Sequence, residues 1–123
     1  MPTKYKLEFE INALPKTLNT SLRMHWASRN TENKKWDRWV NAFAMKQGKP
    51  KAPLQKAILK LTRHSSTAPD PDGLIGSFKC VLDALVSCGV LQDDTFLNVG
   101  IPEYRWEKSK RGYGKITVSL EEV

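Results

Sequence analysis

Residues 69–94 read PDPDGLIGSFKCVLDALVSCGVLQDD, and this stretch predicts the helix around which the rest of the fold is arranged. Apolar residues recur at helical spacing over about residues 73–88, and Gly89 is a suitable residue to end the helix. A sharp turn at Gly89 would allow the segment with Asp93 and Asp94 to return alongside the helix. Five acids and one lysine surround it in a chain of formal net charge +7: Asp70, Asp72, Lys79, Asp83, Asp93 and Asp94. Because crowded carboxylates repel one another, this arrangement points to a divalent metal between them.

Each part of this cluster also has an ordinary structural explanation. Asp-Pro-Asp-Gly before a helix is good turn and N-cap sequence. Lys79 and Asp83 have the spacing of a plain helical ion pair, and the second Asp-Asp pair fits an exposed turn. A calcium loop of the EF-hand type is excluded because position 74 is Leu. The gathering of all these residues around one helix is what favours a metal site.

Outward from this helix, the patterns predict one α+β domain spanning residues 1–123, in the order β-α-β-α-β-β, with two main helices packed on a small mixed sheet. A helix with Thr31 as its N-cap is expected to end near residues 47–48, and Trp36 and Trp39 are expected in its core face. The expected strands cover residues 5–11, 57–63, 104–108 and 115–120, the last two joined as a hairpin by residues 109–112.

Composition and charge indicate the cellular compartment and the class of binding partner. No apolar run approaches the length of a membrane span, and the first residues lack the apolar stretch of a signal peptide, so we expect a cytoplasmic protein. Cys80 and Cys88 would lie about 12 Å apart along one helix, too far for a disulfide. A basic chain with an acidic metal cluster favours a nuclease, and the long loop over residues 12–30 carries candidate phosphate contacts at Lys16, Asn19 and Arg23.

The run PDPDGLIGSFKCVLDAL followed by GVLQDD resembles the signature of the RusA-type Holliday-junction resolvases. That signature is an Asp-x-Asp, a helix bearing a lysine and then Asp-Ala-Leu, and a trailing Asp-Asp. The upstream LPKTLNTSLRMHW is similar to a proline- and asparagine-bearing loop of the same family. The resemblance is close over residues 69–94 and loose over most of the remaining chain.

The resemblance implies an α+β fold, a homodimer and Mg²⁺-dependent cutting of branched DNA, with Mn²⁺ as a possible substitute and no organic cofactor or membrane partner. Asp70, Asp72 and Asp94 would be catalytic residues that hold the metal. Lys79 would be the catalytic lysine. Asp83 matches the Asp of Asp-Ala-Leu, and Asp93 is expected behind the metal ligands or at the surface.

The chain departs from the family pattern at two positions. Gly73 stands where the family usually has Asn, and Lys79 lies seven positions past Asp72 instead of four, although it keeps its four-residue spacing to Asp83. On one continuous helix the two lysine positions differ by about 60° and roughly 4.5 Å. A lysine stem spans that distance, so we expect its ammonium to lean back toward Asp70 and Asp72.

Three functional hypotheses follow. The first is a nuclease that resolves four-way junctions by paired nicks in DNA recombination and repair. The second is a catalytically impaired or non-catalytic DNA-binding protein on the same scaffold. The third is a nuclease for other branched nucleic acids or for RNA.

Overall fold

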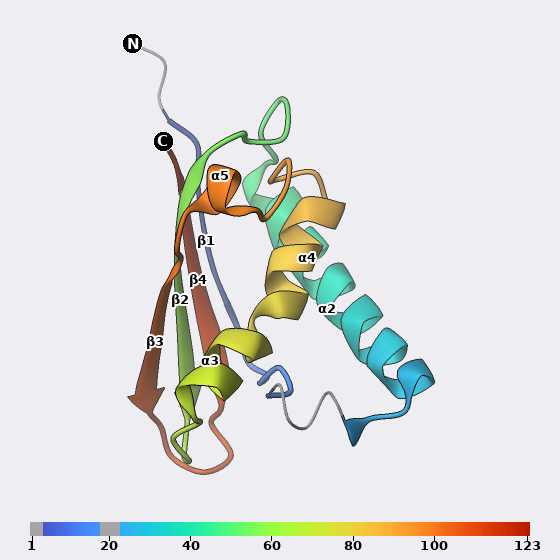
Figure 1. Ribbon diagram of the computed structural model, residues 1–123. Helices are drawn as coiled ribbons and strands as arrows, with labels where there is room; N and C mark the ends of the chain where they lie inside the picture. Colours follow the sequence, from blue (N-terminus) through green and yellow to red (C-terminus); the bar gives the residue numbers. More distant parts are fainter. Residues whose placement is uncertain (1–3, 18–22) are drawn as a thin grey trace.

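Strict alternation of apolar and charged residues produces the first strand. The computed structural model describes residues 4–17 and 23–123, and in it Leu7, Phe9 and Ile11 are buried while the residues between them are exposed. The elements follow as β1 (Lys6–Ile11), α2 (Trp26–Gln47), β2 (Ala57–Ser65), α3 (Pro71–Ser77), α4 (Lys79–Ser87), α5 (Phe96–Val99), β3 (Glu103–Lys108) and β4 (Lys115–Glu122). This is the expected α+β fold (Figure 1).

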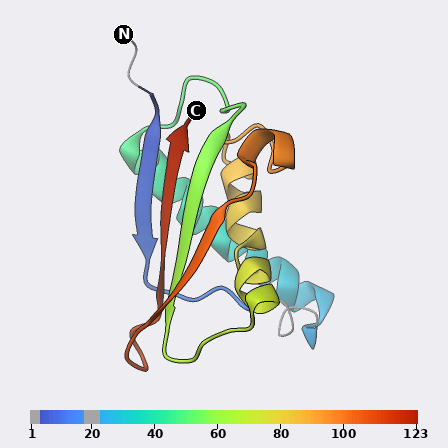
Figure 2. The same cartoon turned by 60° about the vertical axis from the view of Figure 1, so that its left-hand side comes forward.

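The four strands form one mixed sheet in the order β1-β4-β2-β3 (Figure 2). β4 pairs antiparallel with both β1 and β2, whereas β3 pairs parallel with β2. The predicted hairpin between β3 and β4 is therefore wrong, because β2 lies between these strands. A Gly-containing turn between two strands fits a hairpin and a crossing equally well. Here the chain crosses the end of β2, where Ser109 N donates to Ser65 O at 3.0 Å.

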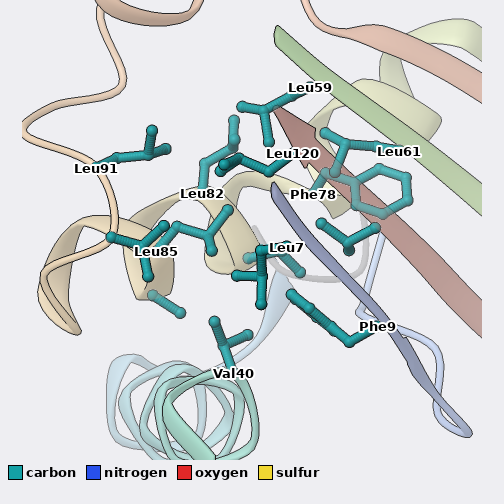
Figure 3. Packing of buried hydrophobic residues seen from close by; sticks show 14 of the residues in the cluster. Leu7, Phe9, Val40, Leu59, Leu61, Phe78, Leu82, Leu85, Leu91 and Leu120 are labelled. Atoms are coloured by element: carbon teal, nitrogen blue, oxygen red, sulfur yellow. The ribbon is translucent and has the colours of Figure 1, made fainter. Parts of the chain in front are cut away.

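The helices cover one face of the sheet and enclose the core between the two layers (Figures 1 and 3). α2 and α4 pack against each other and against the apolar residues of the strands. Each fully buried Leu, Val or Phe side chain contributes about 1.5–3 kcal/mol relative to exposure. The largest side chains that are fully buried include Trp36, Phe78, Leu7, Leu59, Leu61, Leu85, Leu91, Ile116 and Leu120.

α2 begins six residues earlier than predicted. Its N-cap is His25, whose Nδ1 accepts from Ala27 N at 3.2 Å. Thr31 is not the N-cap; its hydroxyl donates to Ala27 O, one turn back. The first turns of α2 are largely exposed, so they carry no apolar period for sequence analysis to detect. The predicted core role of Trp36 and Trp39 is confirmed, with the two rings edge-to-face at 5.0 Å.

The motif helix is two helices, which corrects the single helix predicted over residues 73–88. α3 ends at Ser77 and α4 begins at Lys79, with Phe78 between them at φ −87° and ψ −1°. Phe78 is fully buried, and its ring lies 6.1 Å from that of Tyr104. Ser77 donates its hydroxyl to Leu74 O, a local bond that competes with helix continuation. Lys79 therefore starts a new helix. Its angular position relative to Asp72 does not follow from the 100° per residue of one continuous helix.

The four-residue helix α5 was not predicted, because it is too short to show a period. Thr95 is its N-cap residue, and Asn98 Nδ2 donates to Gln55 O at 2.9 Å. Among the described residues, no helix combines the length and the apolar character that a membrane span requires.

Gly114 allows the loop after β1 to pack on the loop before β4. A Cβ at this position would lie 2.5 Å from Leu14 Cδ1 and 2.7 Å from its Cγ. We expect Gly114→Ala to lower the free energy of unfolding by about 1–3 kcal/mol through overpacking. Urea unfolding measures this loss. In a Leu14→Ala background the same change should cost much less, and equal costs in both backgrounds would contradict the contact.

Candidate functional site

Lys79 joins two parts of the motif that are fifteen residues apart in sequence. Its Nζ donates to Asp94 Oδ2 at 2.7 Å and lies 3.0 Å from Asp83 Oδ1. Lys79 is the first residue of α4, Asp83 lies one turn further along, and Asp94 lies in the segment that follows the helix. The expectation that the second Asp-Asp pair returns alongside the helix is therefore confirmed for Asp94.

The backbone after α4 explains this return. Gly89 has φ +85°, a left-handed conformation that reverses the chain at low steric cost. Leu54 N then donates to Val90 O at 2.8 Å, and Gln92 N donates to Leu54 O at 2.9 Å. These bonds hold residues 90–92 against the segment before β2. Asp93 Oδ1 accepts from Asp94 N at 2.8 Å, so Asp93 shapes the turn that carries Asp94.

The ion pair shifts both partners toward their charged forms. The hydrogen bond to Asp94, followed by that to Asp83, raises the pKa of Lys79. The hydrogen bond from Lys79 holds the pKa of Asp94 below its ordinary value. Asp94 is also the less exposed partner, with 18% of its side chain accessible against 63% for Lys79. Lys79 and Asp94 are thus both charged at neutral pH.

Asp70 and Asp72 lie at the beginning of α3, and both are exposed. Asp70 occupies the N-cap position, where its carbonyl accepts from Leu74 N at 2.8 Å, but its carboxylate makes no capping hydrogen bond. Asp72 lies in the first turn. Neither carboxylate forms an ion pair within the described part of the chain. Both are therefore available to an added cation.

The carboxylates fit Mg²⁺ in part. Carboxylate oxygens are the hard ligands that Mg²⁺ prefers, and Asp70 and Asp72 offer them without competition. However, residues 4–17 and 23–123 contain no three acidic, His or Cys side chains gathered closely enough to hold a metal. The ammonium of Lys79 lies on Asp94, not toward Asp70 and Asp72 as expected from helical side-chain direction. Only Oδ2 of Asp94 accepts from Lys79, so this carboxylate could join the other two through Oδ1 or after the lysine moves away.

A cleft of about 200 Å³ adjoins Lys79. It lies between the loop after β1, the first turns of α2, and the α3–α4 junction. Its charged lining comprises three cations and two acids: Lys16, Arg29, Lys79, Glu32 and Asp83. The mixture suits a phosphate backbone that passes close to a carboxylate site. Lys16 was predicted as a phosphate contact, whereas Arg29 and Glu32 were not, because the early start of α2 was missed.

Two contacts hold the loop that carries Lys16. Arg63 is only 8% exposed, and its Nη1 donates to Pro15 O at 2.7 Å. Burial lowers the pKa of Arg63, and its Nε has no hydrogen-bond partner among the described residues. Thr17 lies against Gly73 in α3, at 3.7 Å from the place a Cβ would take. The loop thus bridges β2 and α3. Of the other two predicted phosphate contacts, Arg23 is exposed, and Asn19 lies outside the described residues.

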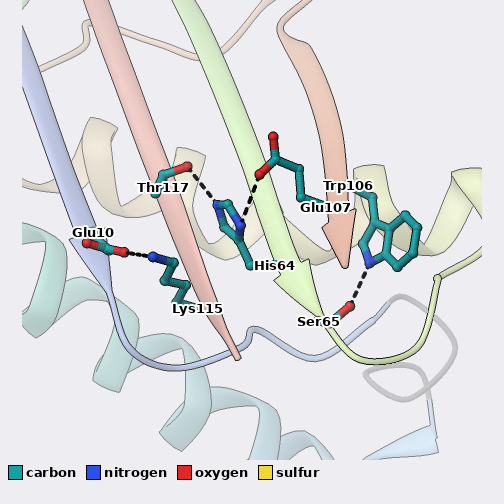
Figure 4. A network of polar contacts seen from close by, with 7 residues as sticks. All are labelled: Glu10, His64, Ser65, Trp106, Glu107, Lys115 and Thr117. Carbon is teal, nitrogen blue, oxygen red and sulfur yellow. Dashed lines mark hydrogen bonds and ion pairs between the residues drawn. The ribbon is translucent and has the colours of Figure 1, made fainter. Parts of the chain in front are cut away.

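The opposite face of the sheet is a weaker candidate for DNA, because its charges pair with one another. Figure 4 shows the ion pair between Lys115 and Glu10, and it shows His64 between Glu107 and Thr117. The His64 Nδ1–Glu107 Oε2 and His64 Nε2–Thr117 Oγ1 distances are both 3.4 Å. These pairs leave little uncompensated positive charge for phosphates. The helix-covered side, with the cleft, is the better candidate.

No model of a known protein family matches this chain. No curated protein sequence matches it either.

Cys80 lines the cleft, but its thiol is not suited to nucleophilic chemistry. Burial is the main cause that raises the pKa of Cys80 to about 12, from an ordinary value of 9.0. At pH 8 its thiolate fraction is about a thousandfold below that of an unperturbed thiol. In a Cys88→Ser background, we expect Cys80 to react with Ellman's reagent at least about a hundredfold slower in the native than in the unfolded protein. Equal rates would show that the thiol is reactive in the fold.

Proposed function

We propose that this protein is a Mg²⁺-dependent endodeoxyribonuclease that cuts four-way DNA junctions by paired nicks and serves DNA recombination and repair in the cytoplasm. The observation that carries the proposal is the contact of Lys79 with both Asp83 and Asp94. It brings the trailing Asp of the resolvase-like motif to the lysine that precedes Asp-Ala-Leu. Two separate parts of the motif thus meet at one place beside a cleft whose charged lining comprises three cations and two acids.

Each residue has a role in this proposal. Asp70, Asp72 and Asp94 would hold Mg²⁺, or Mn²⁺ in its place, and when bound the metal would supply Lewis-acid stabilisation and a more acidic water. Lys79 would stabilise charge that develops on the phosphate, with Asp83 holding its ammonium in position. Lys16 and Arg29 would hold a neighbouring phosphate in the cleft.

Recognition in this proposal relies on shape and phosphate charge, so affinity should fall steeply with salt. A four-way junction has near two-fold symmetry, and a homodimer with two-fold symmetry would present one site to each of two strands. The dimer is part of the proposal because one copy of the site accounts for one nick.

A non-catalytic DNA-binding protein is the second candidate. This candidate is favoured by the ion pair between Lys79 and Asp94 and by the lack of a group of three carboxylates among the described residues. If Asp70, Asp72 and Asp94 stay apart, the protein would bind DNA but would not assemble a metal site. Binding without metal-dependent cleavage is its distinguishing property.

Mapping the cuts on a synthetic four-way junction tests the proposed function. Each of the four strands is end-labelled in turn, and the products are compared with those from a linear duplex of the same sequence. The proposal predicts nicks at symmetric positions in two opposite strands and little cutting of the duplex. Binding with no cuts would favour the second candidate, and equal cutting of duplex would contradict structure selectivity.

A further inference from the structure

Trp26 differs from the other tryptophans of this chain because it is exposed. It is the first residue of α2 and is 67% accessible, whereas Trp36 is fully buried and Trp39 is partly buried against the core. Trp106 is partly buried, and its Nε1 donates to Ser65 Oγ. The ring of His25 lies beside that of Trp26, with centroids 5.7 Å apart and planes inclined by 35°. Two neighbouring aromatic rings thus face solvent at the start of α2.

The surroundings of these rings are cationic. Arg29 lies one turn along α2 and lines the cleft with Lys16 and Lys79, and the exposed Arg23 precedes the rings. Arg23, Arg29 and Lys16 form no ion pair within residues 4–17 and 23–123. The nearest acid along the helix is Glu32. Its carboxylate already bonds Lys35 at 3.1 Å and Trp36 Nε1 at 3.3 Å.

The position of α2 leaves this aromatic pair accessible. The amino-terminal end of the helix extends beyond the sheet in both views (Figures 1 and 2). Over residues 26–33, which read WASRNTEN, the apolar side chains are Trp26 and Ala27 alone. A protein partner would require a wider apolar surface. A lone aromatic pair among unpaired cations instead matches single-stranded nucleic acid, whose bases present π-faces and whose phosphates are anionic.

We propose that Trp26 and His25 form a stacking platform for an unpaired nucleobase of DNA, with Arg23, Arg29 and Lys16 contacting the flanking phosphates. The stacking itself follows from the exposed rings and the charges around them. Its role rests on the proposed function: at a junction, the platform would hold a base at the branch point while the strand beside it enters the cleft next to Lys79.

Fluorescence-monitored binding of a short oligothymidine strand in EDTA tests the platform without any need for cleavage. The anisotropy of a dye attached to the strand reports the affinity, so variants that lack the Trp26 indole are measured in the same way as the wild type. We expect Trp26→Ala to lower the affinity by about 5- to 150-fold, and Trp26→Phe to retain most of it, because phenylalanine also stacks. Trp106→Phe, on the edge strand β3, is the matched control and should bind as the wild type does. Circular dichroism melting verifies that each variant is folded.

A strand with abasic sites isolates the stacking step, because it keeps every phosphate and lacks the bases. The wild type should bind it as weakly as Trp26→Ala binds the normal strand, and Trp26→Ala should not distinguish the two strands. Arg29→Ala should instead weaken both strands equally and reduce the salt dependence. If Trp26→Ala binds the normal strand like the wild type, or loses equal affinity for both strands, the platform is contradicted.

Junction cutting separates this inference from the proposed function. If no variant and no metal yields cutting, while the oligothymidine results hold, the nuclease proposal fails and the platform stands. If the wild type cuts junctions, and Trp26→Ala binds oligothymidine and cuts junctions as well as the wild type does, the platform fails and the nuclease proposal stands.

Discussion

Replacing Asp72 with Asn is expected to abolish junction cutting and to leave junction binding intact or slightly tighter. The change removes one of the two carboxylates that are free at the start of α3, together with a negative charge near the phosphates. Loss of a metal ligand should slow cutting on the order of a thousandfold or more. Because Asp72 is exposed and forms no ion pair among the described residues, its loss should cost stability only about 0.3–1 kcal/mol through the helix dipole.

Single-turnover cleavage and a gel-shift titration on the same junction measure these two effects separately. Glu121→Gln is a suitable control, since it removes one negative charge on β4, where Glu121 forms an exposed ion pair with Lys6. It should cut at the wild-type rate. If Asp72→Asn lost binding and cutting in equal proportion, Asp72 would be supporting the fold or the DNA surface instead of a metal.

Lys79→Ala is expected to slow cutting by about a hundredfold or more, the scale observed when one charge-stabilising group is removed. Its Nζ is held 2.7 Å from Asp94 and 3.0 Å from Asp83, so a compact ammonium is fixed in place. Lys79→Arg should restore little, because a planar guanidinium does not replace an ammonium between two carboxylates. The removal of Lys79 also frees Asp94, so the Mg²⁺ concentration for half-maximal cutting should fall even as the rate falls.

Rate measurements across a Mg²⁺ series give both quantities. Lys6→Ala, which breaks an exposed ion pair with Glu121 on the other side of the sheet, is the matched loss of one positive charge. Cutting by Lys79→Ala at the wild-type rate would reduce Lys79 to a surface partner of the two acids. A higher Mg²⁺ requirement in Lys79→Ala would show that the lysine assists metal binding and does not compete with it.

The parts of the fold that sequence analysis predicted have one face in the core. β1 shows the period of two because Leu7, Phe9 and Ile11 are buried in turn. The carboxy-terminal part of α2 shows the helical period because Trp36 and Val40 pack inward. In these segments the regular alternation of buried and exposed positions appears as a regular spacing of apolar residues. That spacing predicts the strand or helix from the sequence alone.

The missed features depend on local or long-range contacts that leave no such pattern. The start of α2 is capped by His25 and is exposed, so its extent follows from hydrogen bonds and not from periodicity. The break at Phe78 coincides with burial of its ring beside Tyr104, a contact between residues distant in sequence, and with the local bond from Ser77 to Leu74. Strand β3 could not be placed beside β2 because strand partners are chosen by tertiary packing, which a turn signal does not specify.

Some contacts of the candidate site were likewise predicted from the sequence, and others were not. The helical spacing of Lys79 and Asp83 predicted their contact, and the turn at Gly89 predicted the return of Asp94. The lean of Lys79 toward Asp94 was not predicted, because the expected continuous helix is broken just before it. Arg63 was missed as the anchor of the loop at Pro15, since its position on β2 gives no indication of a partner so far away in sequence.

The most direct test of the central claim is the rate at which the purified protein nicks a four-way junction with Mg²⁺ and with EDTA, measured beside binding of the same junction. The account predicts binding in both conditions and nicking only with Mg²⁺, with activity returning when Mg²⁺ is added in excess of EDTA. Nicking that persists in EDTA would contradict the proposed metal centre. Binding in both conditions with no nicking in Mg²⁺ or Mn²⁺ would show that the protein recognises DNA without cutting it.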